Sequence, residues 1–295
     1  MYIEHRKRFY FISYLIILVG LGFMCYNVAD GNGLLNYDIE FKGGTLIYLN
    51  LEEEFNVNLD IRPLTEIYLL DNSAVIQTTD NPTEVIITTK STILDERIAF
   101  MAAIKENFPN AITLEENSFS PTISPEITAK AVQAVILSAI LMLIYIWIRF
   151  QDLKFGTSAV IALIHDILVM LTVYAVFRIP INNSFIAAML TIIGYSINDT
   201  IIVFDRIREN KKLMEKSDNS IIINKSIKQT LSRSINTSLT TLIVVLLLYI
   251  IGTSEVKEFA FPLVIGILSG TYSSIFIASP VWYEMKKNTK KTIRA

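Results

Sequence analysis

Cysteine and histidine are nearly absent from this chain, which has one cysteine and two histidines among its 295 residues. A lone cysteine excludes an intramolecular disulfide. So few thiol and imidazole groups also argue against a dedicated metal site of cysteine and histidine ligands. The sequence has no Walker motif and no helix-opening Gly-x-Gly-x-x-Gly, which excludes ATP binding through a P-loop. Since no nucleophile and base form a recognisable set, we predict a protein that is not an enzyme and uses no cofactor.

Charged residues are also scarce, at 18% of the chain, while 52% of the residues are hydrophobic. With a mean hydropathy of +0.46, this composition excludes an ordinary soluble globular protein. Six apolar runs approach or reach the roughly 20 residues that a membrane-spanning helix needs. They lie at Phe9–Asn27, Ile127–Ile148, Gly156–Phe177, Ser184–Phe204, Ser234–Gly252 and Phe259–Tyr283. The first run is too long for a signal peptide, so we expect it to remain as an anchor.

Lysine and arginine are distributed unevenly among the segments between these runs. Segment 205–233 holds eight of them and more lie near both termini, whereas the short loops on the opposite side hold only Arg178 and Lys257. By the positive-inside rule, both termini and a cytoplasmic loop over 205–233 are predicted to lie inside. Residues 28–126, predicted outside, carry 17 acidic against five basic side chains, which argues against nucleic-acid binding.

Between the first two runs the pattern changes from continuous apolarity to short amphipathic units. Alternating or β-branched residues predict four strands, at Thr45–Leu51, Ala74–Thr79, Glu84–Thr89 and Ala111–Ser118. Helical spacing predicts two helices, at Leu59–Leu70 and Thr92–Phe108. The order βαββαβ is that of a ferredoxin-like α+β domain. We therefore predict a first transmembrane helix in 1–27, an extracytoplasmic domain in 28–126, and five further transmembrane helices with a cytoplasmic tail in 127–295.

Several polar residues lie within the apolar runs. A carboxyl inside a membrane helix is costly unless it is protonated, paired or hydrated, so Asp199 in the fourth run is a functional-site hypothesis. The alternative is an aspartate at a misjudged helix end. His165 and Asp166 lie near the middle of the third run. Two interpretations are open for them, a proton relay and a hydrogen-bonded structural pair between helices. In the sixth run, Gly266 and Gly270 form a GxxxG pattern, which is typical of close helix packing.

Arg233 stands at the start of the fifth run, near the same end of the predicted bundle as Asp199. It shares one helical face with polar side chains, those of Asn236, Thr237, Thr240 and Thr241. An ion pair between Asp199 and Arg233 is therefore sterically reasonable. The alternative for Arg233 is a flanking cation whose place is set by the positive-inside rule.

Three segments resemble the SecD/SecF family of membrane proteins. The most specific reads Gly-Tyr-Ser-Ile-Asn-Asp-Thr over 194–200, followed by a hydrophobic stretch and Phe-Asp-Arg-Ile-Arg-Glu over 204–209. Its signature residues are Gly194, Tyr195, Ser196, Asn198, Asp205 and Arg206. Segments 230–241 and 270–280 agree with the family, and Asp-Ile-Glu-Phe-Lys-Gly-Gly over 38–44 resembles its entry to the outer domain. From the residues alone, Gly43 and Gly44 indicate a tight turn more readily than a ligand cradle.

The resemblance implies a SecF-like subunit of the Sec protein-export machinery in the bacterial inner membrane. It implies SecD and the SecYEG channel as partners, together with YajC and the SecA-driven translocation complex, and unfolded polypeptides as cargo. It also implies that the proton motive force drives the process and that Asp199 and Arg233 couple to it. Two alternatives are a half-size exporter of small molecules, of the resistance-nodulation-division type, and a passive scaffold whose polar groups only join helices.

Overall fold

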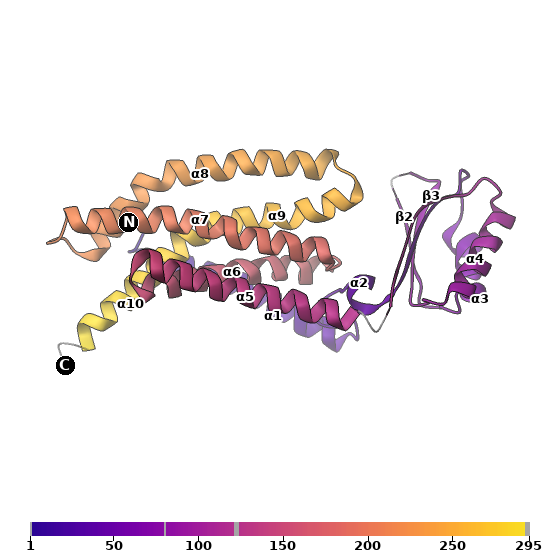
Figure 1. Ribbon diagram of the computed structural model, residues 1–295, viewed down its shortest axis with the longest axis horizontal. Coiled ribbons are helices and arrows are strands. Elements are labelled where there is room, and N and C mark those ends of the chain that lie inside the picture. The colour runs from indigo at the N-terminus through magenta and orange to yellow at the C-terminus, as the bar shows by residue number, and fades with distance from the viewer. Residues whose placement is uncertain (1, 80, 121–123, 293–295) are drawn as a thin grey trace. The chain divides into compact units, whose positions relative to one another are not determined.

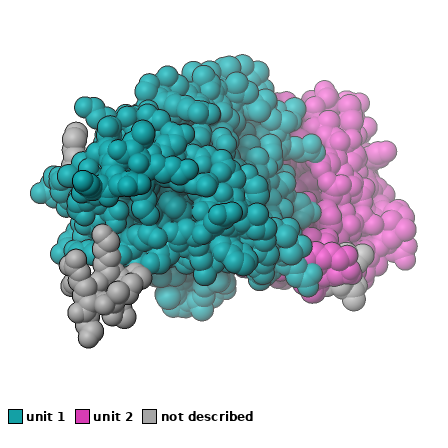
Figure 2. Space-filling view, turned by 60° about the vertical axis from the view of Figure 1, so that its left-hand side comes forward, with its two compact units in different colours: residues 1–36, 132–295 teal, residues 37–131 magenta. Residues whose placement is uncertain are grey.

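The computed structural model describes residues 2–79, 81–120 and 124–292, which fold as two compact units (Figure 1). One unit comprises residues 1–36 and 132–295, and the other comprises residues 37–131 (Figure 2). The boundaries predicted at residues 27 and 126 fall inside helices α1 (Arg6–Ala29) and α5 (Ser124–Phe150). Both helices extend beyond the hydrophobic runs that revealed them.

Within the described residues, six helical segments are long and apolar enough to cross a membrane. They are α1, α5, α6 (Leu153–Phe177), α7 (Asn183–Leu213), α8 (Asn219–Ile251), and a last segment made of α9 (Ser254–Ser273), η2 (Ser274–Ala278) and α10 (Ser279–Thr292). Each coincides with one predicted apolar run. The chain is a multi-pass membrane protein.

Most of the polar segment 205–233, predicted as the cytoplasmic connection between two spans, is helical. Helix α7 continues to Leu213 and α8 already begins at Asn219, so the connection between them is short. The polar segment is helical because isoleucines at helical spacing bury one face of each extension, among them Ile207, Ile223 and Ile227. Across the two extensions, Asn210 Nδ2 donates hydrogen bonds to Ser226 Oγ and Gln229 Oε1, both at 2.8 Å.

The connection between α6 and α7 is short and is fixed by hydrogen bonds at the ends of both helices. Arg178 ends α6 in the left-handed region, with φ 53°. The amide of Ile179 donates to the carbonyl of Tyr174 at 3.2 Å. The side chain of Asn182 then caps α7 by accepting a hydrogen bond from the amide of Phe185 at 3.0 Å. This end of the bundle is thus well defined.

Helices α7 and α9 pack closely because α9 has glycine at the contact. A Cβ atom on Gly266 would lie 2.4 Å from Ile192 Cγ1, and one on Gly270 would lie 2.9 Å from Ser196 Cβ. No side chain fits at such distances without displacement of the neighbour. The two glycines therefore let α9 approach α7, and they bring the serines of α9 within reach of α6 and α7.

The second unit is a four-stranded antiparallel sheet in the order β2-β3-β1-β4. Its strands are β1 (Gly44–Asn50), β2 (Val75–Thr78), β3 (Glu84–Thr89) and β4 (Ile112–Phe119). Helices α3 (Arg62–Tyr68) and α4 (Leu94–Asn107) lie on one face of the sheet (Figure 1). Alternate residues of β1 and β3, such as Ile47 and Ile87, bury against Phe100 and Ile104 of α4.

The predicted strands differ from the observed ones by about a residue at their ends, and Glu84–Thr89 is as predicted. The helical structure predicted over Leu59–Leu70 is present, but its first part is a π-helical turn, η1 (Val57–Ile61), and α3 ends at Tyr68. Pro63 explains the break, because it has no amide to continue the α-helical ladder and is best placed in a first turn.

The pair Gly43 and Gly44 turns the chain from the short helix α2 (Ile39–Lys42) into β1. Their φ angles are 79° and 141°, and a Cβ atom on Gly44 would lie 2.5 Å from the carbonyl oxygen of Thr89. Side chains are excluded here on conformational and on steric grounds. The geometry is that of a turn.

Candidate intramembrane site

Asp199 is buried in the middle of α7 and is weakly held. Its Oδ2 accepts one hydrogen bond, from Ser238 Oγ of α8 at 3.3 Å, and its Oδ1 has no hydrogen-bond partner among the described residues. Ser238 in turn accepts a hydrogen bond from Thr271 Oγ1 of α9 at 2.6 Å. A hydrogen bond of this length is weak, and an unpaired buried acceptor is costly. The carboxyl is therefore free to take a proton or a new partner.

Arg233 is not paired with Asp199. Its side chain is exposed, makes no hydrogen bond or ion pair within the part of the chain that the structure describes, and acts on Asp199 only through space. The rotation of α8 explains this. Ser234 and Ser238 lie on the buried face of α8, and Arg233 lies outside that face. The predicted ion pair is not formed in this structure.

Asp166, by contrast, is fully satisfied. Three serine hydroxyls donate to it, from Ser196 of α7 at 2.6 Å and from Ser269 and Ser273 of α9 at 2.7 Å each. Nδ1 of His165 lies 3.1 Å from the same carboxyl, and Asp166 is only 1% exposed. Hydrogen bonds that share a carboxylate among three helices hold those helices in register. This is an anchoring arrangement.

His165 extends the network toward α1. Its Nε2 lies 3.0 Å from Ser13 Oγ, and Ser13 donates to the hydroxyl of Tyr272 at 3.3 Å. Tyr272 donates to the carbonyl of Phe9 at 2.9 Å, and its ring stacks with that of His165 at 5.9 Å between centroids. The imidazole has one nitrogen toward the carboxyl and the other toward Ser13, which fixes the orientation of the ring.

The motif residues of α7 fall into three groups. Ser196 binds Asp166, and the hydroxyl of Tyr195 donates to the carbonyl of Thr237 at 3.2 Å. Gly194 and Asn198 lie on an exposed face of the helix. Near the end of the span, Asp205 pairs with Arg149 at 3.1 Å, and Arg206 donates to Gln229 at 2.8 Å and to Glu209 at 2.6 Å.

Sequence reasoning did not identify Ser13 and Ser269 as members of this site. A serine in an apolar run carries little signal, because its hydroxyl can bond to its own helix backbone. Their roles depend on the aspartate or histidine that the packing brings opposite them. The sequence shows that the apolar runs contain polar residues, but it does not show which of these residues form hydrogen bonds with one another.

A family model described as protein export membrane protein SecD/SecF, C-terminal, matches residues 99–288. The chain belongs to the SecD/SecF family of protein-export membrane proteins. It is 37% identical to protein translocase subunit SecF of Petrotoga mobilis, over 98% of this chain and 97% of that relative. It is 39% identical to SecF of Calditerrivibrio nitroreducens, over 98% and 95% of the two chains.

The crystal structure of SecDF from Thermus thermophilus is similar with a TM-score of 0.84 at 33% identity. The match covers 97% of this chain but 38% of that one, so this member of the SecD/SecF family spans well under half of the SecDF chain. The region matched by the SecD/SecF model begins within α4 and includes both aspartates, Arg233 and the serines of α9. Ser13 lies outside it.

Proposed function

We propose that this chain is the SecF-type subunit of a Sec protein-export machine in the bacterial inner membrane. In this role it promotes the translocation and release of unfolded polypeptides at the SecYEG channel, and YajC and SecA belong to the same assembly. Similarity to chains named protein translocase subunit SecF, over nearly their whole length, supports the proposal. It is a transport role rather than an enzymatic one.

SecD is the proposed permanent partner. A Thermus thermophilus relative named protein translocase subunit SecDF is 37% identical over 86% of this chain, which corresponds to 35% of that relative, and this supports a SecD-like part beside a SecF-like part. Exposed polar residues within the spans, Asn198 of α7 and Asn236 and Thr240 of α8, add physical support. Polar side chains that face lipid are costly, so a neighbouring membrane subunit is expected to cover them.

In the proposed orientation both termini are cytoplasmic and residues 28–126 form an extracytoplasmic ferredoxin-like domain. The concentration of lysine and arginine in 205–233 and near the termini supports the orientation. The strand order β2-β3-β1-β4, with helices after β1 and β3, supports the ferredoxin-like description. Residues 127–295 are the main membrane part.

Proton coupling is assigned to Asp199, and the observation that carries this assignment is its unpaired Oδ1. A proton moving through 100 mV supplies about 2.3 kcal/mol, which exceeds the worth of one long hydrogen bond to Ser238. Protonation can therefore exchange the partners of Asp199, and Arg233 is close enough to become one when α8 moves. Asp166 and His165 hold α6 against α7, α9 and α1 during such a change.

The test uses inverted membrane vesicles that contain SecD with the wild-type chain or with Asp199→Asn. The amide keeps the shape of the side chain but cannot ionise. We expect translocation of a preprotein with ATP alone to be unchanged, and the stimulation by a proton gradient to be lost. Arg233→Met is expected to give a similar defect.

Asp205→Asn is the matched control, because it makes the same chemical change on the same helix at a residue that pairs with Arg149 near the surface. Gradient stimulation should persist in this variant. If Asp199→Asn also kept full stimulation by the proton gradient, the coupling role of Asp199 would be rejected. The alternative of a passive scaffold, whose polar groups only join helices, would then be favoured.

A further inference from the structure

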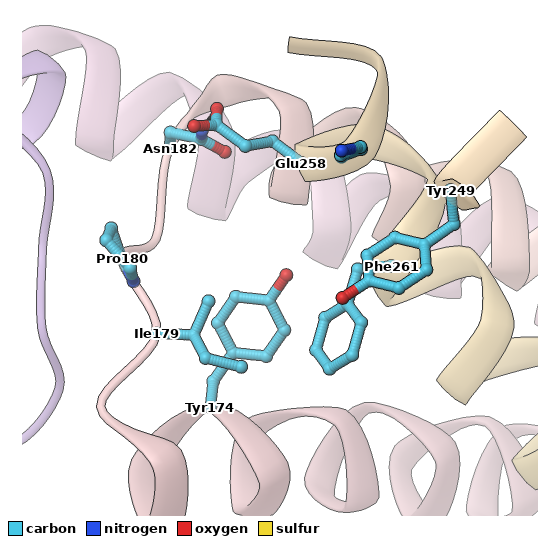
Figure 3. Close-up of a pocket in the computed structure, with 8 residues that line it drawn as sticks. Tyr174, Ile179, Pro180, Asn182, Tyr249, Glu258 and Phe261 are labelled. Carbon is cyan, nitrogen blue, oxygen red and sulfur yellow. Dashed lines mark hydrogen bonds between the residues drawn. The ribbon is translucent and has the colours of Figure 1, made fainter. Parts of the chain in front are cut away.

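A pocket of about 280 Å³ lies where α6 and α8 end and α9 begins (Figure 3). The rings of Tyr174, Tyr249 and Phe261 form much of its wall, with Ile179 from the α6–α7 connection. Lys257 lines it as well. The pocket belongs entirely to the first unit and shares no residue with the Asp199 and Asp166 sites.

Tyr174 is a buried residue whose hydroxyl has no hydrogen-bond partner among the described residues. The residue is 2% exposed, and its ring is held 4.4 Å from that of Phe185 and 6.2 Å from that of Phe261, measured between centroids. No hydrogen bond to its hydroxyl forms among the residues that the structure describes. Figure 3 shows this hydroxyl pointing into the pocket. The hydroxyl is thus a donor that only an occupant of the pocket can satisfy.

Tyr249 and Lys257 also line the pocket. The hydroxyl of Tyr249 points into the pocket in Figure 3 and has no hydrogen-bond partner in the described part of the chain. The ammonium of Lys257 forms no ion pair with any described residue. Glu258, also on the wall, accepts a hydrogen bond from Asn182. The pocket thus combines two hydroxyl donors, the cation of Lys257, the carboxylate of Glu258 held by Asn182, and an aromatic wall.

We propose that this pocket binds the phosphodiester headgroup region of a phospholipid. Tyr174, Tyr249 and Lys257 donate to the phosphate and ester oxygens, and the aromatic wall covers the glycerol and the start of an acyl chain. The volume lies near the lower limit of small-molecule pockets, roughly 300 Å³, so it suits a headgroup rather than a whole lipid.

The position of the pocket favours a lipid over an exported peptide. It lies at the ends of membrane-spanning helices, where tyrosines commonly sit at the headgroup level. Ile250 and Ile251, next to Tyr249 on α8, are 67% and 78% exposed and face the surroundings of the bundle. An anionic phosphate also complements Lys257, which has no ion-pair partner among the described residues, while the Glu258 carboxylate is bound by Asn182. Binding does not depend on export activity.

Native mass spectrometry of the full chain in detergent with added phosphatidylglycerol tests the proposal. Tyr174→Phe removes only the hydroxyl, and Lys257→Gln removes only the charge. Each is expected to weaken lipid binding roughly tenfold, as a lost hydrogen bond to a charged group would. Tyr26→Phe is the matched control, since Tyr26 is 63% exposed near the end of α1, and it should bind like the wild type.

Unfolding midpoints of the variants check that the fold is kept, and Lys257→Gln, at a half-buried position, carries the test if Tyr174→Phe is unstable. Unchanged lipid binding in both variants would overturn the proposal. Displacement of the lipid by equimolar glycerol 3-phosphate would also overturn it, because the pocket would then be a site for free phosphate. Weak or absent competition by glycerol 3-phosphate supports a lipid.

Discussion

At the scale of single residues, two buried aspartates have opposite surroundings. Asp166 receives three serine hydroxyls and a histidine, whereas Asp199 receives one long hydrogen bond. Burial alone does not distinguish them, since both are 1% exposed. The number of hydrogen-bond donors does distinguish them. A carboxylate whose oxygens are all hydrogen-bonded is held in place, whereas one with an unpaired oxygen can accept a further donor.

Asp166→Asn should therefore be a stability variant. The amide presents one acceptor oxygen to three donors, so at least one charge-assisted hydrogen bond is lost and others weaken. We expect a loss of about 2–4 kcal/mol, from roughly 1.5–3 kcal/mol for each hydrogen bond to a charged group. The unfolding midpoint in detergent and the abundance in membranes measure it.

Asp199→Asn serves as the comparison for that experiment. Only the bond to Ser238 is at stake there, so its midpoint should shift far less. Equal destabilisation by the two variants would contradict the division of roles.

At the scale of elements, the rotation of each helix decides which polar residues meet. On α8 the buried stripe runs through Ser226, Thr230, Ser234 and Ser238, and not through Arg233 and Asn236. On α9, the glycines place Ser269 and Ser273 against Asp166. A shift of one residue turns a helix face by 100°, so neighbouring residues have different environments.

Gly266→Ala is expected to destabilise the contact between α7 and α9. A Cβ atom there would lie within 2.8 Å of three atoms of Ile192. Overpacking costs roughly 1–3 kcal/mol, which exceeds the gain of up to about 1 kcal/mol in helix propensity. Thermal unfolding of the purified chain should show a lower midpoint.

Gly22→Ala is the control for this packing effect. A Cβ atom on Gly22 of α1 meets nothing within 4 Å, so the alanine should be neutral or slightly stabilising. A midpoint for Gly266→Ala at or above that of Gly22→Ala would refute close packing as the role of Gly266.

At the scale of the whole molecule, the chain has the features of one part of a larger membrane assembly. Its relatives include a SecDF chain of which it matches 38%, and the spans α5 and α8 bury little of their surface within this chain while the last span buries most of its own. Apolar residues can face lipid at no cost, but the polar face of α8 cannot. The uncovered faces point to a neighbour.

The proposed topology is tested with single cysteines on a Cys25→Ser background. A cysteine introduced at Ser217, between α7 and α8, should react with a membrane-impermeant thiol reagent only after the membrane is opened. A cysteine at Asn72, before β2, should react in intact spheroplasts. Reaction at Ser217 in sealed spheroplasts would reverse the orientation.

The sequence by itself determined the six spans, their approximate limits, the alternating strands of the second unit and the family. Each of these features follows from local periodicity or from a contiguous motif, which can be read without knowing which distant residues are in contact. The helical extensions over 205–233 likewise follow from isoleucine spacing within a polar segment.

Only the tertiary structure decided which polar groups meet. Helix rotation, and contacts between residues far apart in the chain, place three serines on Asp166 and leave one oxygen of Asp199 unpaired. They also separate Arg233 from Asp199 and bury Tyr174 beside the pocket. The glycines of α9 set the distance at which those contacts form. Hydrogen bonds act over about 3 Å, so small rotations that no sequence pattern specifies determine whether they exist.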